Sequence, residues 1–226
     1  MATSPPLYGP QQSRFARYLE RREERRPDQH ARELRRKLIA RLRGRVLELG
    51  CGDGRAFEHY RPGVEHVLAV EPDDVARAVA TPRAREAAVP IEVVEGSAEA
   101  LPAEDGTFDA AVVVWVLCSV AHPAAALGEL RRVLKPGGEL HFYEHVRSPH
   151  RVFRAMQRAV DALFWTRALG GCETARHTIA AIAAAGFEIV ALERGFHSSS
   201  LLTITSAPHV VGVARARTAA SRAATR

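Results

Sequence analysis

The residues best suited to chemistry begin with a glycine-rich loop. Residues 50–54 read Gly-Cys-Gly-Asp-Gly and directly follow the apolar run 45–49. Glycines let the backbone turn sharply and let a ligand approach it without Cβ atoms in the way. Glu48 lies two residues before the first glycine, where its carboxylate can face that ligand. The spacing E-x-G-x-G-x-G is not the dinucleotide fingerprint G-x-G-x-x-G, because Arg55 occupies the sixth position.

Further polar side chains follow later strands. Glu71 ends the second expected strand, about twenty residues after the glycine loop. An acidic residue at this place can accept hydrogen bonds from both ribose hydroxyls of an adenosine. Asp53 has two interpretations, as a ligand-facing residue or as the cap of a following helix. Residues 97–99 and 117–120 also follow strand ends, which is where open α/β sheets bind their ligands.

Glu144 and His145 end the fifth expected strand. His145 is the best candidate for a general base, since its ordinary pKa of about 6.5 suits proton transfer near neutrality. The alternative is that His145 only lines the substrate pocket or orients a loop. Glu144 either orients His145 or points to the opposite face, because adjacent strand residues face opposite ways. His122, at the start of a helix, is a second candidate.

The cysteines and histidines show no metal-binding pattern. Cys51, Cys118 and Cys172 form no C-x-x-C pair, and no histidines have a spacing such as H-x-x-x-H. We therefore expect no metal site, and we expect Cys118 to be a small core residue rather than a nucleophile. Unpaired cysteines are typical of a reducing compartment, so the expected location is cytoplasmic.

The composition is that of a globular protein. Hydrophobic residues make up 46% of the 226 residues, and the net charge is +6. Nearly all cations are arginine, with Lys37 and Lys135 as the only lysines, which together with abundant alanine indicates GC-rich coding rather than nucleic-acid binding. The apolar run 110–121 is too short to span a bilayer, and no signal peptide is recognisable. Peripheral contact with an anionic membrane remains open.

Strands and helices alternate along most of the chain. The expected strands are 45–49, 66–71, 91–94, 108–116, 138–145, 187–193 and 209–215. The expected helices are 11–26, 28–42, 54–60, 73–80, 123–134, 148–165 and a segment from Thr174 to Gly186. Such alternation predicts an α/β fold with right-handed crossovers between parallel strands.

This sequence of motifs resembles the class I S-adenosylmethionine (SAM) methyltransferases. The resemblance implies a seven-stranded Rossmann-like sheet with helices on both faces and an antiparallel last strand. It places the methyltransferase domain at 44–215, with a helical lead-in or lid at 1–43, a substrate cap at 146–172 and a disordered tail at 216–226. The Asn/Asp-Pro-Pro-Tyr/Phe tetrad of amino-group methyltransferases is absent after the fourth strand, which argues against base N-methylation.

The same resemblance implies a set of cofactor-binding residues. Residues 97–99 resemble the adenine-binding segment, although many members carry Asp where Ser97 stands. The residues expected to bind SAM are Glu48, Gly50, Cys51, Gly52, Asp53, Gly54, Glu71, Pro72, Ser97, Ala98, Glu99 and Leu117.

A closer resemblance is to the methyltransferase-like alkyl thiol S-methyltransferases, over residues 44–215. It is carried by Val116-Leu-Cys-Ser-Val120, Glu144-His-Val146 and Gly171-Cys-x-Thr-x-Arg176. Animal members have a hydrophobic N-terminal anchor that charged segments replace here. Residues 194–206 match poorly, which leaves the substrate open. The residues expected to contact the acceptor are His122, Phe153, Trp165, Cys172 and Arg176, with His145 as the catalytic residue.

This resemblance implies methyl transfer from SAM to a small thiol by in-line displacement. A free thiol is a few per cent ionised at pH 7, and the thiolate is very nucleophilic. The alternatives are a C- or O-methyltransferase of a quinone or other natural product, and a noncatalytic SAM-binding module. No nucleic-acid partner and no integral membrane segment are expected, and the oligomeric state stays open.

Overall fold

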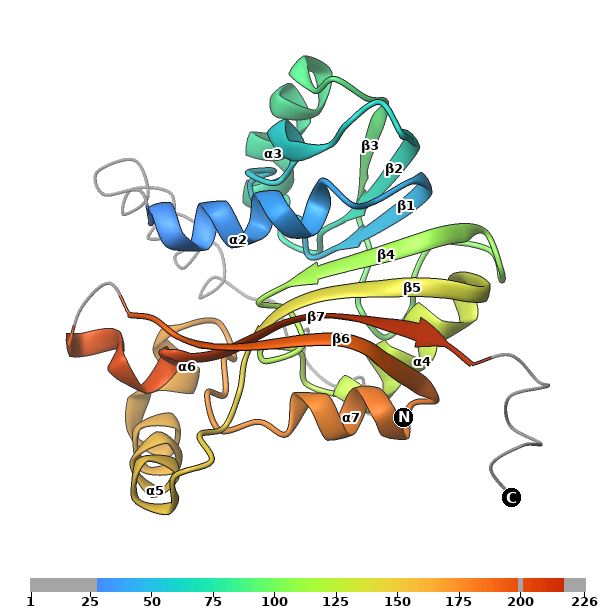
Figure 1. The fold of residues 1–226 in the computed structure, drawn as a ribbon. Helices are drawn as coiled ribbons and strands as arrows, with labels where there is room; N and C mark the ends of the chain where they lie inside the picture. Colours follow the sequence, from blue (N-terminus) through green and yellow to red (C-terminus); the bar gives the residue numbers. More distant parts are fainter. Residues whose placement is uncertain (1–27, 199–200, 218–226) are drawn as a thin grey trace, which may run out of the picture.

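A seven-stranded sheet forms the centre of the computed structural model, which describes residues 28–198 and 201–217 (Figure 1). The strand order is β3-β2-β1-β4-β5-β7-β6. The first five strands are parallel, and β7 runs antiparallel to both β5 and β6, which confirms the predicted sheet. The strands are β1 (Gly44–Leu49), β2 (Val64–Val70), β3 (Ile91–Val94), β4 (Phe108–Val114), β5 (Leu134–His145), β6 (Phe187–Phe196) and β7 (Pro208–Ala216).

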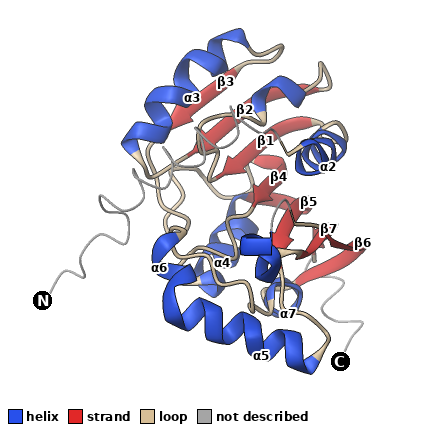
Figure 2. Ribbon diagram, turned by 90° about the vertical axis from the view of Figure 1, so that its left-hand side faces the viewer, coloured by secondary structure: helices blue, strands red, loops and turns tan. Residues whose placement is uncertain are grey.

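Helices cover both faces of the sheet, as Figure 2 shows. The helices α2 (Gln29–Ile39) and α3 (Asp74–Glu86) pack on the face that carries Val46 and Val112. The helices α4 (Pro123–Val133) and α7 (Thr178–Ala184) pack on the opposite face, against Leu47 and Val113. Neighbouring strand residues therefore belong to two different cores, as the pleat of a strand requires.

Helix boundaries follow local capping and packing. The carboxylate of Asp73 accepts from the backbone N–H of Ala76 at 2.8 Å and so begins α3. The prediction that this helix stops at residue 80 is wrong, because α3 continues through Pro82. Ala80 and Ala84, on either side of the proline, are both buried against the sheet.

Three other predicted helices differ from the structure. Only a short 3-10 helix, η1 (Phe57–His59), forms in the segment 54–60. The predicted helix 148–165 begins later and is divided into α5 (Arg151–Val160), the π-helical segment η2 (Asp161–Trp165) and α6 (Thr166–Ala168). The helix expected from Thr174 starts only at Thr178, because the Thr174 hydroxyl is bonded to Asp161.

The chain ends give mixed outcomes. The helix expected at 11–26 lies outside the described residues. Ala216 belongs to β7 and pairs with Phe187, so the expected tail does not begin at that residue. In the described part of the chain, the helices are too short and too polar to cross a bilayer.

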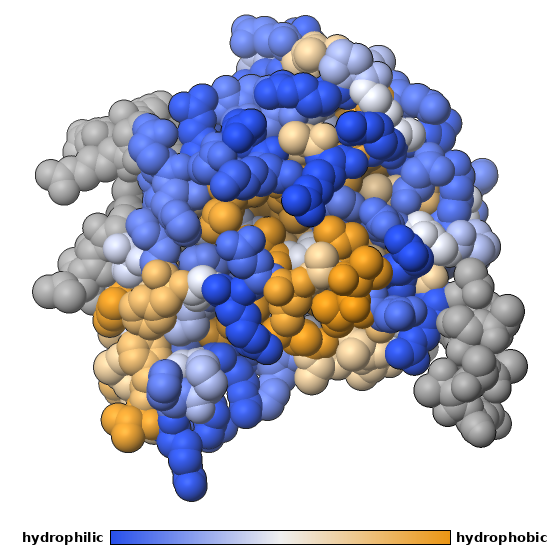
Figure 3. Space-filling view, viewed as in Figure 1, coloured by the Kyte–Doolittle hydropathy of each residue, from blue (hydrophilic) through white to orange (hydrophobic). Residues whose placement is uncertain are grey.

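One end of the molecule exposes apolar side chains. Val152 on α5, Leu163 on η2 and Phe196 at the end of β6 are 85%, 75% and 61% exposed. Figure 3 shows this hydrophobic surface at the end that carries α5 and α6. A short 3-10 helix, η3 (Leu201–Ser206), connects β6 to β7 at this end.

Candidate functional site

A cavity of about 680 Å³ lies beyond the carboxyl ends of β1, β2, β4 and β5. One part is lined by the glycine loop and by Glu71, and the other by His145 and Trp165. The segment formed by η2, α6 and the following loop covers the second part. We call these parts the glycine-loop end and the acceptor end.

The glycine loop has the backbone that its sequence predicts. Gly50 has φ of +68°, and its N–H donates to the carbonyl of Val70 at 2.8 Å. A Cβ at Gly50 would lie 2.5 Å from Cγ2 of Val116, on the loop after β4. The glycine therefore serves both the turn and the close approach of two strand-end loops.

Glu71 joins the loops after β1 and β2. Its two carboxylate oxygens accept from the N–H groups of Gly52 at 2.9 Å and Asp73 at 3.0 Å. Burial raises the pKa of Glu71, and these two hydrogen bonds oppose the rise. Each oxygen keeps a lone pair, so the carboxylate can still accept from a ligand in the cavity.

Glu48 is a second buried carboxylate at the glycine-loop end. It accepts a 2.7 Å hydrogen bond from the hydroxyl of Tyr60. Burial raises the pKa of Glu48 to about 7, against the lowering effects of Tyr60 and Arg35. Arg35 reaches this region from α2 and lies over the ring of Trp115, 5.6 Å from its centre.

Asp53 lines the cavity beside this carboxylate pair. It forms ion pairs with Arg55 at 2.7 Å and with Arg83 at 2.8 Å. Neither interaction is a helix cap, so the second interpretation of Asp53 is wrong.

The loop after β4 is built on Glu144. This fully buried carboxylate accepts from the N–H groups of Val116, Leu117 and Cys118 at 2.9, 2.9 and 3.0 Å. Burial raises the pKa of Glu144, and the three donors oppose the rise. Glu144 thus points away from His145 and fixes the loop that lies beside it.

Trp115 lies in a rare backbone conformation just before this loop. Its φ of +59° is the one positive value among the described non-glycine residues. Its indole stacks on the His145 imidazole, with ring centres 5.4 Å apart and planes 11° from parallel. Strained residues of this kind cluster at functional sites, and here the strain places an aromatic wall at the acceptor end.

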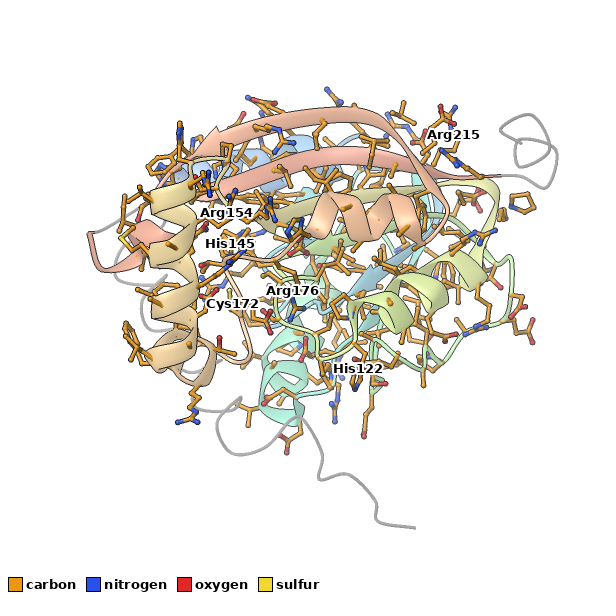
Figure 4. The ribbon with its side chains drawn as sticks, turned by 90° about the horizontal axis from the view of Figure 1, so that it is seen from below. His122, His145, Arg154, Cys172, Arg176 and Arg215 are labelled. Carbon is orange, nitrogen blue, oxygen red and sulfur yellow. The ribbon has the colours of Figure 1, made fainter. Side chains whose placement is uncertain are left out.

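His145 lies beside two cysteines. Its Nδ1 atom is 3.7 Å from Sγ of Cys118 and 3.6 Å from Sγ of Cys172, and the two sulfurs are 3.8 Å apart. Figure 4 shows His145 next to Cys172, with His122 well away from both. All three side chains line the cavity. The contact with the Cys172 thiol, together with burial, keeps the pKa of the Cys118 thiol well above its usual range.

The cap over the acceptor end is tied to the sheet by polar side chains. The buried Gln157 donates to the carbonyls of Val146, Thr174 and Thr205 and accepts from the N–H of Ser148. The N–H of Glu173 donates to the carbonyl of Cys118 at 2.8 Å. These bonds hold the Cys172 loop against the loop after β4.

Most predicted cofactor residues lie where the sequence places them. Those that line the cavity are Glu48, Gly50, Cys51, Gly52, Asp53, Glu71, Pro72 and Ala98. Gly54, Ser97, Glu99 and Leu117 lie outside the lining. Gly54 is packed against Phe57, and Glu99 accepts from the N–H of His122 at 3.4 Å.

The predicted acceptor residues divide in the same way. Trp165 and Cys172 line the cavity, whereas His122 is exposed at the start of α4. Phe153 is outside the lining and packs against Phe196, with ring centres 5.7 Å apart. Arg176 donates to the carbonyls of Leu117 and Val120 at 2.8 and 2.6 Å, which makes it a clamp on the loop.

Sequence reasoning missed part of the site. Arg35, Trp115 and His197 line the cavity but belong to no motif. The residues around them in the sequence predict ordinary positions in helices and strands and give no sign of a site. Trp115 alone carried a signal, as a bulky aromatic residue at the end of a buried strand.

The glycine-loop end fits SAM. Glu71 offers free carboxylate lone pairs for ribose hydroxyls, and Glu48 offers negative charge for an ammonium group. A Cβ at Gly52 would meet nothing within 4 Å, so the backbone there is open to a ligand. The residues present therefore suit the amino-acid and nucleoside parts of that cofactor.

Comparison with known proteins gives the family. The profile described as "Methyltransferase domain" matches residues 47–142. Human thiol S-methyltransferase TMT1B is 34% identical over 172 residues, which cover 75% of this chain and 69% of the relative. A ubiquinone biosynthesis O-methyltransferase from Paraburkholderia xenovorans is 36% identical over 105 residues, 46% of this chain and 45% of the relative.

Solved structures agree on the fold. A SAM-dependent methyltransferase from Methanosarcina mazei superposes with a TM-score of 0.60 at 22% identity, over 76% of this chain and 92% of the other.

Proposed function

We propose that this chain, which belongs to the SAM-dependent methyltransferases and within them to the family of TMT1A and TMT1B, transfers a methyl group from SAM to a small thiol. The methyltransferase activity and the cofactor follow from the family. The thiol acceptor is the proposal. The observation that carries it is the lining of the acceptor end, where the His145 imidazole lies among apolar walls and two cysteine sulfurs.

Bound SAM supplies a methyl group on a sulfonium sulfur, ready for in-line displacement. In this proposal the protein holds the nucleoside through Glu71 and Ala98, and the amino-acid part through Glu48 and the glycine loop. The acceptor end is then left for the second substrate. Most of the acceleration comes from positioning the acceptor sulfur in a dry cavity.

The acceptor end suits a neutral organic thiol. Trp115, Phe164, Trp165 and Leu169 form its apolar walls. Such walls favour the alkyl or aryl part of an acceptor. We assign the activation of the thiol to His145, which lies between Trp115 and the two cysteines.

Activation of a thiol requires little free energy. A thiol with a pKa of about 8.5 is a few per cent ionised at pH 7, so full ionisation is worth about 2 kcal/mol. One well-placed group can supply this amount. A phenol, with a pKa of about 10, needs roughly twice as much.

We place the reaction in a reducing cytoplasm, because Cys118 and Cys172 lie side by side as free thiols.

A quinone O- or C-methyltransferase is the second candidate, favoured by the relative from Paraburkholderia xenovorans. The deciding experiment compares matched acceptors, such as an aryl thiol and the phenol of the same shape, with SAM turnover measured as S-adenosylhomocysteine release. We expect turnover of the thiol at pH 7 and at least tenfold less of the phenol. Turnover of phenols or quinols alone would overturn the thiol assignment, and SAM binding without any turnover would favour a binding module.

A further inference from the structure

Three side-chain atoms that can each coordinate a metal ion meet at the acceptor end, and they come from three separate segments. Cys118 follows β4, His145 ends β5, and Cys172 follows α6. Sγ of Cys118, Nδ1 of His145 and Sγ of Cys172 all lie within 4.8 Å of one another. Among the residues that the structure describes, this is the group of histidine, cysteine and acidic side chains close enough to share one metal ion.

The distances between these atoms match one face of a tetrahedron around zinc. With Zn–S of about 2.3 Å and Zn–N of about 2.0–2.1 Å, tetrahedral angles place two sulfurs about 3.8 Å apart and a sulfur about 3.6 Å from a nitrogen. The observed separations are 3.8 Å between the sulfurs and 3.6 and 3.7 Å from sulfur to nitrogen. A disulfide would need the sulfurs at about 2.0 Å, so the two cysteines are not bonded to each other.

The three side chains are held in place before any ion binds. Glu144 accepts from the N–H of Cys118, and Trp115 stacks on the imidazole of His145. The carbonyl of Cys118 accepts from the N–H of Glu173, which follows Cys172 directly. Ligands on a rigid framework of this kind lose little entropy when a metal binds.

Hydrogen bonding among the three groups explains the cluster less well. The three mutual contacts are 3.6, 3.7 and 3.8 Å long, and each involves a thiol, which is a weak donor and a weak acceptor. Cys118 is fully buried, and Cys172 is 6% exposed. Two thiolates would neutralise Zn²⁺, so a zinc site would carry no net charge in these apolar surroundings.

We propose that Cys118, His145 and Cys172 bind one Zn²⁺ whose fourth coordination position faces the cavity and takes the sulfur of the acceptor thiol. The zinc site itself stands on the geometry alone. The identity of its fourth ligand rests on the proposed thiol methyltransferase function. Three protein ligands with one open position are typical of catalytic zinc, whereas structural zinc has four protein ligands.

The reaction at such a site balances without an oxidant or reductant. At such a site His145 would activate the thiol as a zinc ligand rather than as a base: the acceptor S–H bond would break, its proton would pass to solvent, and the sulfur would bind zinc as a thiolate. The thiolate sulfur then forms a bond to the methyl carbon, while the bond from that carbon to the sulfonium sulfur breaks and leaves its electron pair there. The thioether product is a weaker zinc ligand and leaves the site.

Metal analysis of the full-length protein tests the zinc site without any activity measurement. We expect one zinc per chain after purification in reducing buffer, by plasma mass spectrometry. Replacement by Co²⁺ is expected to give a thiolate-to-cobalt absorption band. Protein that holds no zinc and fails to take up added Zn²⁺ or Co²⁺ would overturn the proposal.

Matched variants identify the ligands. Cys118→Ser, Cys172→Ser and His145→Ala are each expected to lose the cobalt–thiolate spectrum or shift it, and to lose most of the zinc. Cys51→Ser is the control for metal binding, because Cys51 lies in the glycine loop away from this cluster. Circular dichroism checks that every variant is folded, and S-adenosylhomocysteine binding adds a second check for the three ligand variants. Zinc that survives all three ligand substitutions would place the metal elsewhere.

The fourth ligand is tested separately from the site. The experiment uses cobalt-substituted protein with S-adenosylhomocysteine bound. Adding an alkyl thiol is expected to shift its visible absorption bands, whereas adding the alcohol of the same shape is expected to leave them unchanged. Removing the metal is expected to slow thiol methylation about thirtyfold at pH 7, the inverse of the free thiolate fraction. Full activity of metal-free protein would overturn the zinc role and leave the thiol function standing. Zinc binding without a thiol-induced shift would support the zinc site but contradict the assignment of the acceptor thiol as its fourth ligand.

Discussion

The two ends of the cavity are built in different ways. At the glycine-loop end, a continuous segment from Glu48 to Gly54 supplies most of the lining, and Glu71 reaches it from the adjacent strand. At the acceptor end, Cys118, His145 and Cys172 are spaced 27 residues apart along the chain and meet only through folding. The first end is a local motif held by backbone geometry. The second depends on a buried carboxylate and on a cap tied across the sheet.

This difference suggests how a family can keep its methyl donor while its acceptors diverge. A motif of contiguous residues survives changes in distant segments, since its shape depends on its own backbone. A site assembled from three segments changes whenever any of them moves. The comparison predicts distinct failures when each end is damaged.

The largest effect is expected from Glu144→Ala at the acceptor end. The substitution leaves three backbone N–H groups without their acceptor, at roughly 1–2 kcal/mol each, so we expect a loss of about 4 kcal/mol in the free energy of unfolding. Urea unfolding measures it. The control is Glu95→Ala, whose exposed ion pair with Arg77 at 3.2 Å is worth at most about 1 kcal/mol. Equal losses in the two variants would contradict the role assigned to Glu144.

Gly50→Ala is expected to damage the glycine-loop end. Its Cβ would meet Val116 at 2.5 Å, and its φ of +68° costs a non-glycine residue about 1–2 kcal/mol. We expect S-adenosylhomocysteine binding, measured by calorimetry, to weaken at least tenfold. Gly106→Ala is the matched control, with a φ of +62° and no atom within 4 Å of the added Cβ. If Gly106→Ala weakened binding as much, the close contact with Val116 would not be the cause.

Glu48→Gln tests the electrostatics of the glycine-loop end. The pKa of Glu48 is raised to about 7 in the folded protein, from 4.5. The folded state therefore keeps a proton that the unfolded state releases, and stability falls as pH rises from 4.5 to 7. Glutamine cannot ionise, so the variant is expected to match the wild type at pH 4 and to exceed it by about 2–3 kcal/mol at pH 8.

The mirror-image control is Glu33→Gln on α2. The Arg36 side chain lowers the pKa of this exposed carboxylate to about 2, so its contribution is present above pH 4.5 and fades as pH falls through 2. Relative to the wild type, the Glu48→Gln variant should therefore be more stable at pH 8 and the Glu33→Gln variant less stable, and unfolding curves at lower pH should show both differences shrinking as the pH falls to 2. If Glu48→Gln did not increase the free energy of unfolding at pH 8, burial would not disfavour the ionised form of Glu48 as we infer.

Much of the fold and of the glycine-loop end could be predicted from the sequence. The strand 91–94 has its predicted limits, and the other strands agree within a few residues. The apolar runs of β1, β4 and β5 are largely buried on both faces, so their composition alone predicts these strands. The starting residues of the helices were harder to predict. Thr174 and Ser148 look like helix starts, but their hydroxyls are occupied by Asp161 and by the N–H of His150.

The acceptor residues show why the rest could not be predicted. Arg176 and His122 belong to polar segments that look suited to substrate binding, yet one clamps a loop and the other is exposed. Cys118 looks like a small core residue and is fully buried, but it also lines the cavity beside His145. The sequence does not show that a buried thiol also faces a cavity, because this depends on how the loops are arranged in the folded protein.

The strand positions, the glycine loop and the acidic residue that follows β2 could be predicted because each depends on residues close to it in the chain. The acceptor end follows from contacts between distant segments. The tertiary structure brought Cys118, His145 and Cys172 together, turned Glu144 into the anchor of the loop after β4 and placed Trp115 against the imidazole. Contacts between segments 27 residues apart depend on how strands pair and how the cap packs, and no spacing along the chain encodes them.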